Sequence, residues 1–198
     1  MTGFIESRGY SLLELMMVSA LGVMLGASAV PGYLSALDDI RTSGAAHHLS
    51  ARLQRARMEA VRRSAMVGLR FTQTPDGHYG YALYVDGNRN GVLSDDIQQG
   101  VDRLITAIER LPDQFAGVEF GAIPALPAVD AGGKPPGADP IRLGAGNIAS
   151  FSAVGTATSG TVYIRGRRGS QYAVRIFGET GKSRLLKFEP KAGKWRQL

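Results

Sequence analysis

A single carboxylate lies near the start of a long apolar stretch. Residues 10–30 are almost wholly apolar, and Glu14 lies just inside them. At about 1.5 Å of rise per residue, a helix of this length spans the roughly 30 Å hydrocarbon core of a membrane. An acidic side chain there costs about 2.5–3.5 kcal/mol on insertion scales. Glu14 is therefore a candidate functional residue that requires a positively charged partner.

The residues just before the apolar stretch indicate a processing site. An ordinary secretory signal places its small-residue cleavage site after the apolar region, whereas here the small residue Gly9 precedes it. Cleavage after Gly9 would leave the apolar segment on the mature protein as an anchor and would create a new amine at Tyr10. The alternative is an ordinary single-pass anchor in which Glu14 is incidental.

A second group of charged residues lies near the C-terminus. Residues 161–198 hold ten Lys or Arg against Glu179 and Glu189, in a chain of net charge +6. A basic cluster on strands and turns is the electrostatic footprint of a nucleic-acid surface. Tyr163, Tyr172 and Trp195 are candidates for base stacking, although they are equally natural in a sheet. The alternative is a solvated basic face that meets acidic neighbouring subunits or anionic lipid. The candidate nucleic-acid residues are Arg165, Arg167, Arg168, Lys182 and Arg184.

Two further motifs have ordinary structural interpretations. Residues 86–91 carry oxygen ligands at the first, third and fifth positions and Gly at the sixth, as at the start of a calcium loop. The twelfth position is Ile97, where a bidentate carboxylate is needed, so a tight turn is favoured over an ion site. Adjacent His47 and His48 point about 100° apart on a helix, which favours a solvated pair over a shared metal.

Nothing in the sequence indicates catalysis or a cofactor. It contains no Walker loop, no HExxH, no GxSxG and no cysteine. The acidic pairs Asp38–Asp39 and Asp95–Asp96 are adjacent in sequence rather than placed to face each other across a cleft. We therefore expect no enzyme, no metal and no cofactor.

The elements that position these residues follow from periodicity. Leu49, Leu53, Ala56 and Ala60 form a helical stripe, so the helix is expected to continue beyond the membrane through residues 32–65. Pro31–Gly32 should bend it, and Ser43–Gly44 is a softer break. Residues 66–198 alternate in polarity between turn residues and predict a β-rich head. Residues 122–139, with four prolines and three glycines, predict a partly mobile surface loop. The expected strands are 67–71, 79–85, 118–120, 141–143, 148–151, 161–165, 171–177, 185–188 and 194–198.

The N-terminal pattern resembles the type IV prepilin family, which includes the pseudopilins of type II secretion. In that family the leader ends in Gly, and Glu is the fifth residue of the mature chain, matching Gly9 and Glu14. Pro31 matches a frequent helix-kinking proline, whereas Tyr10 replaces the usual Phe. The resemblance implies cleavage after Gly9 and N-methylation at Tyr10 by a prepilin peptidase. The Glu14 carboxylate would then neutralise the Tyr10 amine of an adjacent subunit in an apolar filament core.

The head residues are similar to the branch that contains the H-type minor pseudopilin and the FimT minor pilin. The similarity lies in Tyr84–Gly91, in Gly155–Ile164 and in Gly178–Arg184. It implies two antiparallel sheets packed against the helix. The FimT side is associated with DNA uptake through a basic Gly-Arg-x-Arg stretch. Gly181–Arg184 is similar, with Lys182 in place of the first Arg.

Together these observations predict an α+β protein with a long N-terminal transmembrane and amphipathic helix packed on a head of two antiparallel sheets. We expect a prepilin leader at 1–9, a transmembrane half-helix at 10–31 and a periplasmic head at 66–198. The positive-inside rule places Arg8 in the cytoplasm and Asp38–Asp39 beyond the bacterial inner membrane. Two functions remain: an assembly subunit of a secretion pseudopilus or type IV pilus, and a DNA-binding minor pilin. The expected partners are prepilin peptidase, other pilins, inner-membrane lipid and, in the second case, DNA.

Overall fold

The computed structural model describes residues 10–144 and 146–198. The expected leader, including Gly9 and its cleavage, lies outside the described residues. The chain divides into two compact units, one that ends at Leu37 and one that comprises Asp38–Leu198. Helix α1, Leu12–Arg63, is long and apolar enough in its N-terminal part to cross a membrane, by length and composition.

Helix α1 continues without interruption through both positions at which the sequence predicts a bend or break. Pro31 lies inside it, and the helix also continues through Ser43 and Gly44. The prediction of a break at Ser43–Gly44 is therefore wrong. A Cβ at Gly44 would lie 3.1 Å from the Phe115 ring, so this glycine permits a close side-chain approach. The helix ends at Arg63, and Ser64 follows it with a left-handed φ of 49°.

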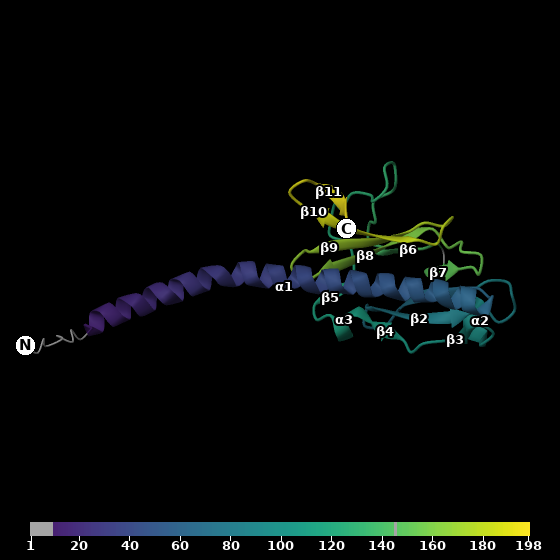
Figure 1. The fold of residues 1–198 in the computed structure, drawn as a ribbon, viewed down its shortest axis with the longest axis horizontal. Helices are drawn as coiled ribbons and strands as arrows, with labels where there is room; N and C mark the ends of the chain where they lie inside the picture. Colours follow the sequence, from purple (N-terminus) through teal and green to yellow (C-terminus); the bar gives the residue numbers. More distant parts are fainter. Residues whose placement is uncertain (1–9, 145) are drawn as a thin grey trace, which may run out of the picture. The chain divides into compact units, whose positions relative to one another are not determined.

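Two antiparallel sheets form the head, as predicted, and the fold is α+β and pilin-like (Figure 1). The first has the order β3-β2-β1-β7, with β4 also paired to β2. The second has the order β11-β10-β9-β8-β5, with β6 also paired to β8. The strands of the first sheet are β1 Val67–Gln73, β2 Tyr79–Val85, β3 Arg103–Leu104, β4 Glu109–Arg110 and β7 Ile148–Phe151. Those of the second are β5 Val118–Phe120, β6 Ile141–Arg142, β8 Gly160–Gly166, β9 Gln171–Ile176, β10 Ser183–Glu189 and β11 Lys194–Gln197.

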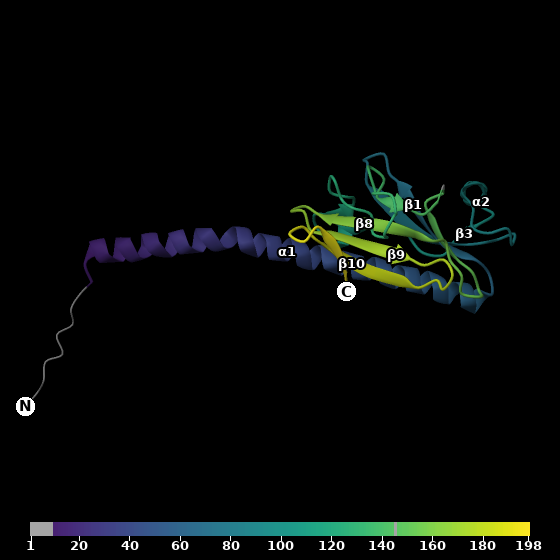
Figure 2. The ribbon, with the colours of Figure 1, turned by 90° about the horizontal axis from the view of Figure 1, so that it is seen from above.

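The long strands are joined by the turns that the sequence predicts. Gly77, Gly169 and Gly181 have φ values of 84°, 93° and 59°, which a side chain would disfavour. Their positions fix the registers of the β1–β2, β8–β9 and β9–β10 pairs. Figure 2 shows β8, β9 and β10 following one another across the second sheet.

Four short elements were not predicted. They are β3, β4, α2 (Ser94–Gln99) and α3 (Leu111–Gln114). Each has at most six residues, too few to establish a hydrophobic period. The loop 122–139 contains no helix or strand, as expected, but it is not simply a surface loop. Leu126 is buried with Tyr163, Ala173 and Phe188, and Trp195 Nε1 donates to the Pro127 carbonyl at 3.0 Å.

The predicted stripe of α1 is buried in the core that both sheets share. Leu49, Leu53, Ala56 and Ala60 belong to one cluster with residues such as Leu69 of β1 and Ile164 of β8. Figures 1 and 2 show this part of α1 running along one side of the β-rich head. The small alanines permit close approach of the strands, while the leucines fill the space between the layers.

We expect Leu49→Ala to lower the free energy of unfolding of the head by about 2–5 kcal/mol, because Leu49 is fully buried and its truncation leaves a cavity. Met58→Ala is the matched control, since Met58 lies on the same helix and is 64% exposed. It should change stability by less than about 0.5 kcal/mol. Thermal and denaturant unfolding of the detergent-solubilised chain measures both. Equal effects would contradict the burial of this stripe.

Candidate functional site

The two predicted assembly residues lie at the start of α1. Glu14 is in the first turn of the helix, and Tyr10 precedes the helix and is exposed. Around Glu14, the apolar side chains of Leu12, Leu13 and Leu15 are also exposed. A helix that is apolar on all faces is covered by lipid or by other helices when it is stable. This part of the chain is therefore a candidate surface for both membrane and neighbouring subunits.

The head begins with two aspartates that hold α1 to the second sheet. Asp38 Oδ2 accepts the Ser170 N–H at 3.3 Å, in the β8–β9 turn. Gly166 has to be glycine at this approach, because a Cβ would collide with the Asp38 carboxylate and the Thr42 hydroxyl. No local sequence pattern marks this contact between Asp38 and Ser170, because the two residues are far apart in the chain.

Asp39 makes the second connection to the sheet. Its Oδ1 accepts the Tyr172 hydroxyl at 3.0 Å, and its Oδ2 accepts Lys187 Nζ at 2.7 Å. The hydrogen bond to Asp39 raises the pKa of Lys187, against the opposing effect of burial. Burial and the same carboxylate raise the pKa of Tyr172. Lys187, counted above in the basic C-terminal region, is therefore an internal partner of the helix.

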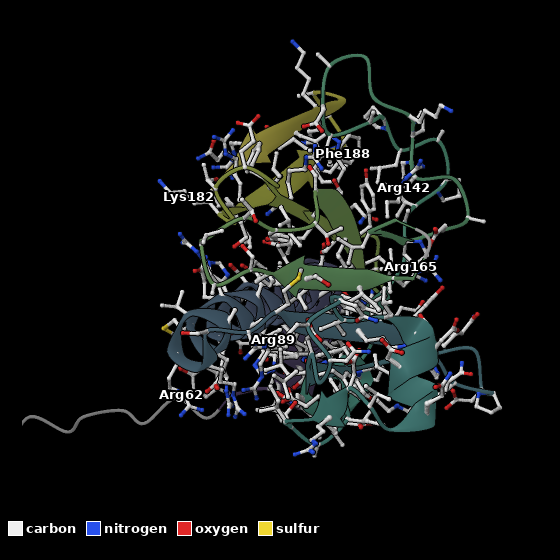
Figure 3. All side chains as sticks on the ribbon, turned by 90° about the vertical axis from the view of Figure 1, so that its right-hand side faces the viewer. Arg62, Arg89, Arg142, Arg165, Lys182 and Phe188 are labelled. Carbon is white, nitrogen blue, oxygen red and sulfur yellow. The ribbon has the colours of Figure 1, made fainter. Side chains whose placement is uncertain are left out.

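The five candidate nucleic-acid residues do not come together. Arg165 is neutralised by Glu119, with its guanidinium 2.6 Å from the carboxylate. Arg167 and Arg168 are exposed in the β8–β9 turn. Lys182 and Arg184 are exposed at the β9–β10 turn, which lies at the other end of these antiparallel strands. Figure 3 shows Lys182 and Arg165 on opposite sides of the head.

The distance between the β8–β9 and β9–β10 turns can be measured along helix α1, which contacts both turns. Asp38 contacts Ser170 in the β8–β9 turn, whereas the Arg57 side chain packs against Gly181 in the β9–β10 turn. The nineteen helical steps from Asp38 to Arg57 rise about 28 Å. The two turns are therefore distinct sites, and the five candidate residues do not form one continuous basic surface.

The aromatic side chains that were candidates for base stacking are buried or packed against other residues of the head. Tyr163 and Tyr172 are both 2% exposed, and Trp195 packs on Phe188 and donates to Pro127. At the β9–β10 turn, however, the Arg184 guanidinium lies 5.0 Å from the ring centre of Phe177. These residues line a shallow groove of about 460 Å³ between α1 and the end of the second sheet. Its other lining residues are His47, Ser50, Thr180, Lys182, Ser183, Leu185, Gln197 and Leu198.

The segment Asp86–Gly91 is a tight turn closed by its own carboxylate. Asp86 Oδ1 accepts the N–H groups of Asn88 and Arg89, and its Oδ2 accepts that of Gly91 at 2.8 Å. Asp102 bonds the backbone of the same loop. Across residues 10–144 and 146–198, no three His, Cys, Asp or Glu side chains are grouped to hold a metal ion. The described geometry thus agrees with the turn interpretation.

The histidine pair divides into two environments. His47 is exposed and bonds the Ser43 carbonyl, as a solvated residue does. His48 is half-buried, with Nε2 3.0 Å from Glu109 Oε2, so the prediction of a solvated pair is wrong for His48. Arg52 pairs with the same carboxylate at 2.8 Å. This cluster joins α1 to β4.

The comparisons with known proteins agree with the fold and with the apolar N-terminal helix. A family described as type II transport protein GspH matches residues 45–180, more than half of the chain. The chain belongs to this GspH family. A pilin-like protein, PilA1 of Thermus thermophilus, is 46% identical over 85 residues, which are 42% of this chain and 51% of that protein. The chain thus spans about half the length of this curated relative. No solved structure gave a significant match.

Members of a pilin-like family are structural subunits that assemble with other pilins. Within the GspH-matched region, residues 45–180, lie most of the buried half of α1 and the strands from β1 to β9. The apolar N-terminal part of α1 precedes the matched region and is consistent with a membrane anchor. The type II transport description and the pilin-like name agree with the resemblance found in the sequence.

We expect Glu109→Gln to destabilise the head at neutral pH by about 1–3 kcal/mol, because it removes a charge-assisted contact between α1 and β4. Burial alone would raise the pKa of Glu109, but hydrogen bonds from His48 and Arg52 outweigh burial and lower it below 4.5. The stabilisation is therefore present above pH 4.5 and is lost as the pH falls through the lowered value. Denaturant unfolding from pH 7 to acid should show the two proteins converging. Exposed Glu179→Gln is the control, and a pH-independent difference would contradict the ionic contact.

Proposed function

We propose that this chain is a minor pseudopilin or pilin, anchored in the inner membrane and incorporated into a filament with other pilins. The observation that carries the proposal is Glu14 in the first turn of an exposed apolar helix that continues into a GspH-type head. Prepilin peptidase would cleave after Gly9 and methylate the amine of Tyr10. The head would face the periplasm.

The proposed assembly mechanism is electrostatic. A carboxylate and an amine each incur a large desolvation cost in hydrocarbon, and their mutual pairing offsets it. The Glu14 carboxylate of one subunit would pair with the Tyr10 amine of an adjacent subunit. Because only one axial offset brings these two groups together, the pair would fix the register while the apolar helices supply the contact area.

The GspH family favours a secretion pseudopilus over a type IV pilus. The matching family is described as a type II transport protein, which supports a role in protein secretion and transport. The pilin-like relative supports the same filament architecture but does not distinguish a secretion pseudopilus from a type IV pilus. We therefore place the subunit in a type II secretion pseudopilus, with a type IV pilus as the alternative.

We expect Glu14→Ala to insert in the membrane normally but to be lost from filaments, because the neighbouring amine would be left unpaired. Glu179→Ala, which removes an exposed head carboxylate, is the matched control and should assemble as the wild type does. Quantitative immunoblotting of membrane and sheared-filament fractions measures both steps. Mass spectrometry of the membrane protein should give an N-terminus at methylated Tyr10. An intact Met1 start or normal incorporation of Glu14→Ala would overturn the proposal.

DNA binding is a second candidate function, and the β9–β10 turn supports it. Lys182 and Arg184 are exposed, and none of the ion pairs among the described residues uses them. Arg184 also covers Phe177 at the edge of the groove. Arg57 adds a further positive charge beside Gly181. Arg165 is excluded from this candidate site by its pairing with Glu119, and Arg167 and Arg168 by their distance.

If this turn binds DNA, Lys182→Ala with Arg184→Ala should weaken binding and reduce the slope of log K against log salt by about 2, because each lost phosphate contact contributes roughly 0.9. Arg167→Ala with Arg168→Ala removes the same charge at the other end of the strands and is the control. Fluorescence anisotropy with duplex DNA over a salt series measures both. Equal losses in the two double variants would contradict a site at this turn.

A further inference from the structure

We propose that the anchor end of the head carries a binding surface for anionic phospholipid headgroups, formed by Arg41, Arg167, Arg168 and Lys191. We call these four residues the anchor-end basic patch. The inference rests on the proposed membrane anchor and goes beyond it. It assigns the head itself a contact with the bilayer surface, separate from the apolar span.

Strand connectivity brings the patch together. In the antiparallel order β8-β9-β10-β11, the β8–β9 and β10–β11 turns lie at the same end of the sheet. The first turn carries Arg167 and Arg168, and the second carries Lys191. Asp38 contacts Ser170 in the first turn, and Asp39 contacts Lys187 shortly before the second. Arg41 lies three residues after Asp38 on α1, a little less than one helical turn.

The same contacts identify this end as the one joined to the apolar segment. Asp38 is the first residue of the head and follows directly on Leu37. Seven residues lie between Val30, the last residue of the apolar stretch, and Asp38, and all of them are helical. The eight helical steps from Val30 to Asp38 amount to a linker of about 12 Å. The headgroup layer beyond the hydrocarbon is about 5–8 Å thick on each side, and fixed charges act over a further 8–10 Å at physiological salt.

The patch carries net positive charge toward that layer. Two other basic residues at this end have acidic partners: Lys187 pairs with Asp39, and Arg196 pairs with Glu189. Lys194, exposed at the start of β11, is in none of the ion pairs among the described residues and adds to the positive charge. Asp38 is only 8% exposed and is turned toward Ser170. Within the described residues, the ion pairs leave all four patch residues without a carboxylate partner, and all four are exposed. The aliphatic part of the Arg167 side chain lies against Gly117.

Lipid phosphate is the partner that this location favours. The anchor would keep the head permanently close to the surface of its own membrane. DNA or an acidic protein would have to diffuse to the same place before it could bind. Each basic residue close to an anionic leaflet changes the binding equilibrium about fivefold. Four such residues at one end are sufficient to hold the head against an acidic surface and to release it when the salt concentration rises.

The absence of cysteine from the sequence permits a direct test on the full chain. Ala192→Cys places one donor fluorophore in the β10–β11 turn, and Val154→Cys, 88% exposed, places it beyond β7 near Arg57. The labelled chain is inserted in nanodiscs of phosphatidylcholine alone, or of phosphatidylcholine mixed with phosphatidylglycerol, with acceptor-labelled headgroups. Energy transfer from the Ala192→Cys donor should increase with phosphatidylglycerol and decrease with added salt. Transfer from the Val154→Cys donor should stay lower.

The triple variant Arg167→Gln, Arg168→Gln and Lys191→Gln should reduce the docked-to-undocked ratio about a hundredfold, from about fivefold per charge. Glutamine keeps most of each side-chain stem, so the head should retain its unfolding temperature. The matched control, Arg55→Gln, Lys182→Gln and Arg184→Gln, removes the same charge from exposed residues outside the patch. It should dock as the parent does.

Three results would overturn the inference. The first is equal transfer with and without phosphatidylglycerol, and the second is an equal loss in the two triple variants. The third is a response of the patch donor to added DNA but not to phosphatidylglycerol, which would assign these residues to nucleic acid. Failure to co-elute with either nanodisc would overturn the proposed anchor, and is distinguishable from all three because it precedes the transfer measurement.

Discussion

One face of α1 provides the contact around which both sheets assemble. Leu49, Leu53, Ala56 and Ala60 are all buried in the cluster that also holds residues of β1 and β8. The main core joins α1 to both sheets, since an open sheet requires a second layer over its apolar face. The second sheet also has a smaller cluster without the helix, made of Leu126, Tyr163, Ala173 and Phe188. One face of the helix therefore serves as the layer that both sheets share, while its opposite face, with Met58 and Val61, is exposed.

The polar contacts of α1 then fix where along the helix each sheet lies. Asp38 and Asp39 bond the second sheet near one end of the head, and His48 and Arg52 bond Glu109 of the first sheet farther along. Apolar packing is non-directional and tolerates sliding, whereas these hydrogen bonds have defined partners. Together they set the register between helix and strands. That register also determines which turns lie near the anchor and which lie far from it.

The sequence was sufficient to predict those helices and strands whose polarity pattern repeats over many residues or whose ends are marked by a turn-forming glycine. The α1 stripe, the β1–β2 hairpin and the β8–β9–β10 meander were predicted because each repeats its pattern over many residues or ends at a glycine with positive φ. Helix α3 and strand β4 were missed because two to four residues carry no period. The roles of His48 and Gly44 depend on Glu109 and Phe115, more than sixty residues away. No local pattern encodes such partners.

The basic C-terminal region shows why charge along a sequence is an incomplete guide to a surface. Ten basic residues in one segment suggested a single nucleic-acid site. In the fold, alternate turns of an antiparallel meander lie at opposite ends, so neighbouring basic turns are separated by the length of the strands. Arg165, Arg175, Lys187 and Arg196 are moreover held by carboxylates. What remains is two small exposed groups, one beside Arg57 and one at the anchor end. Only the second group lies at the end of the head where the chain continues into the apolar segment, so different partners are physically reasonable for each.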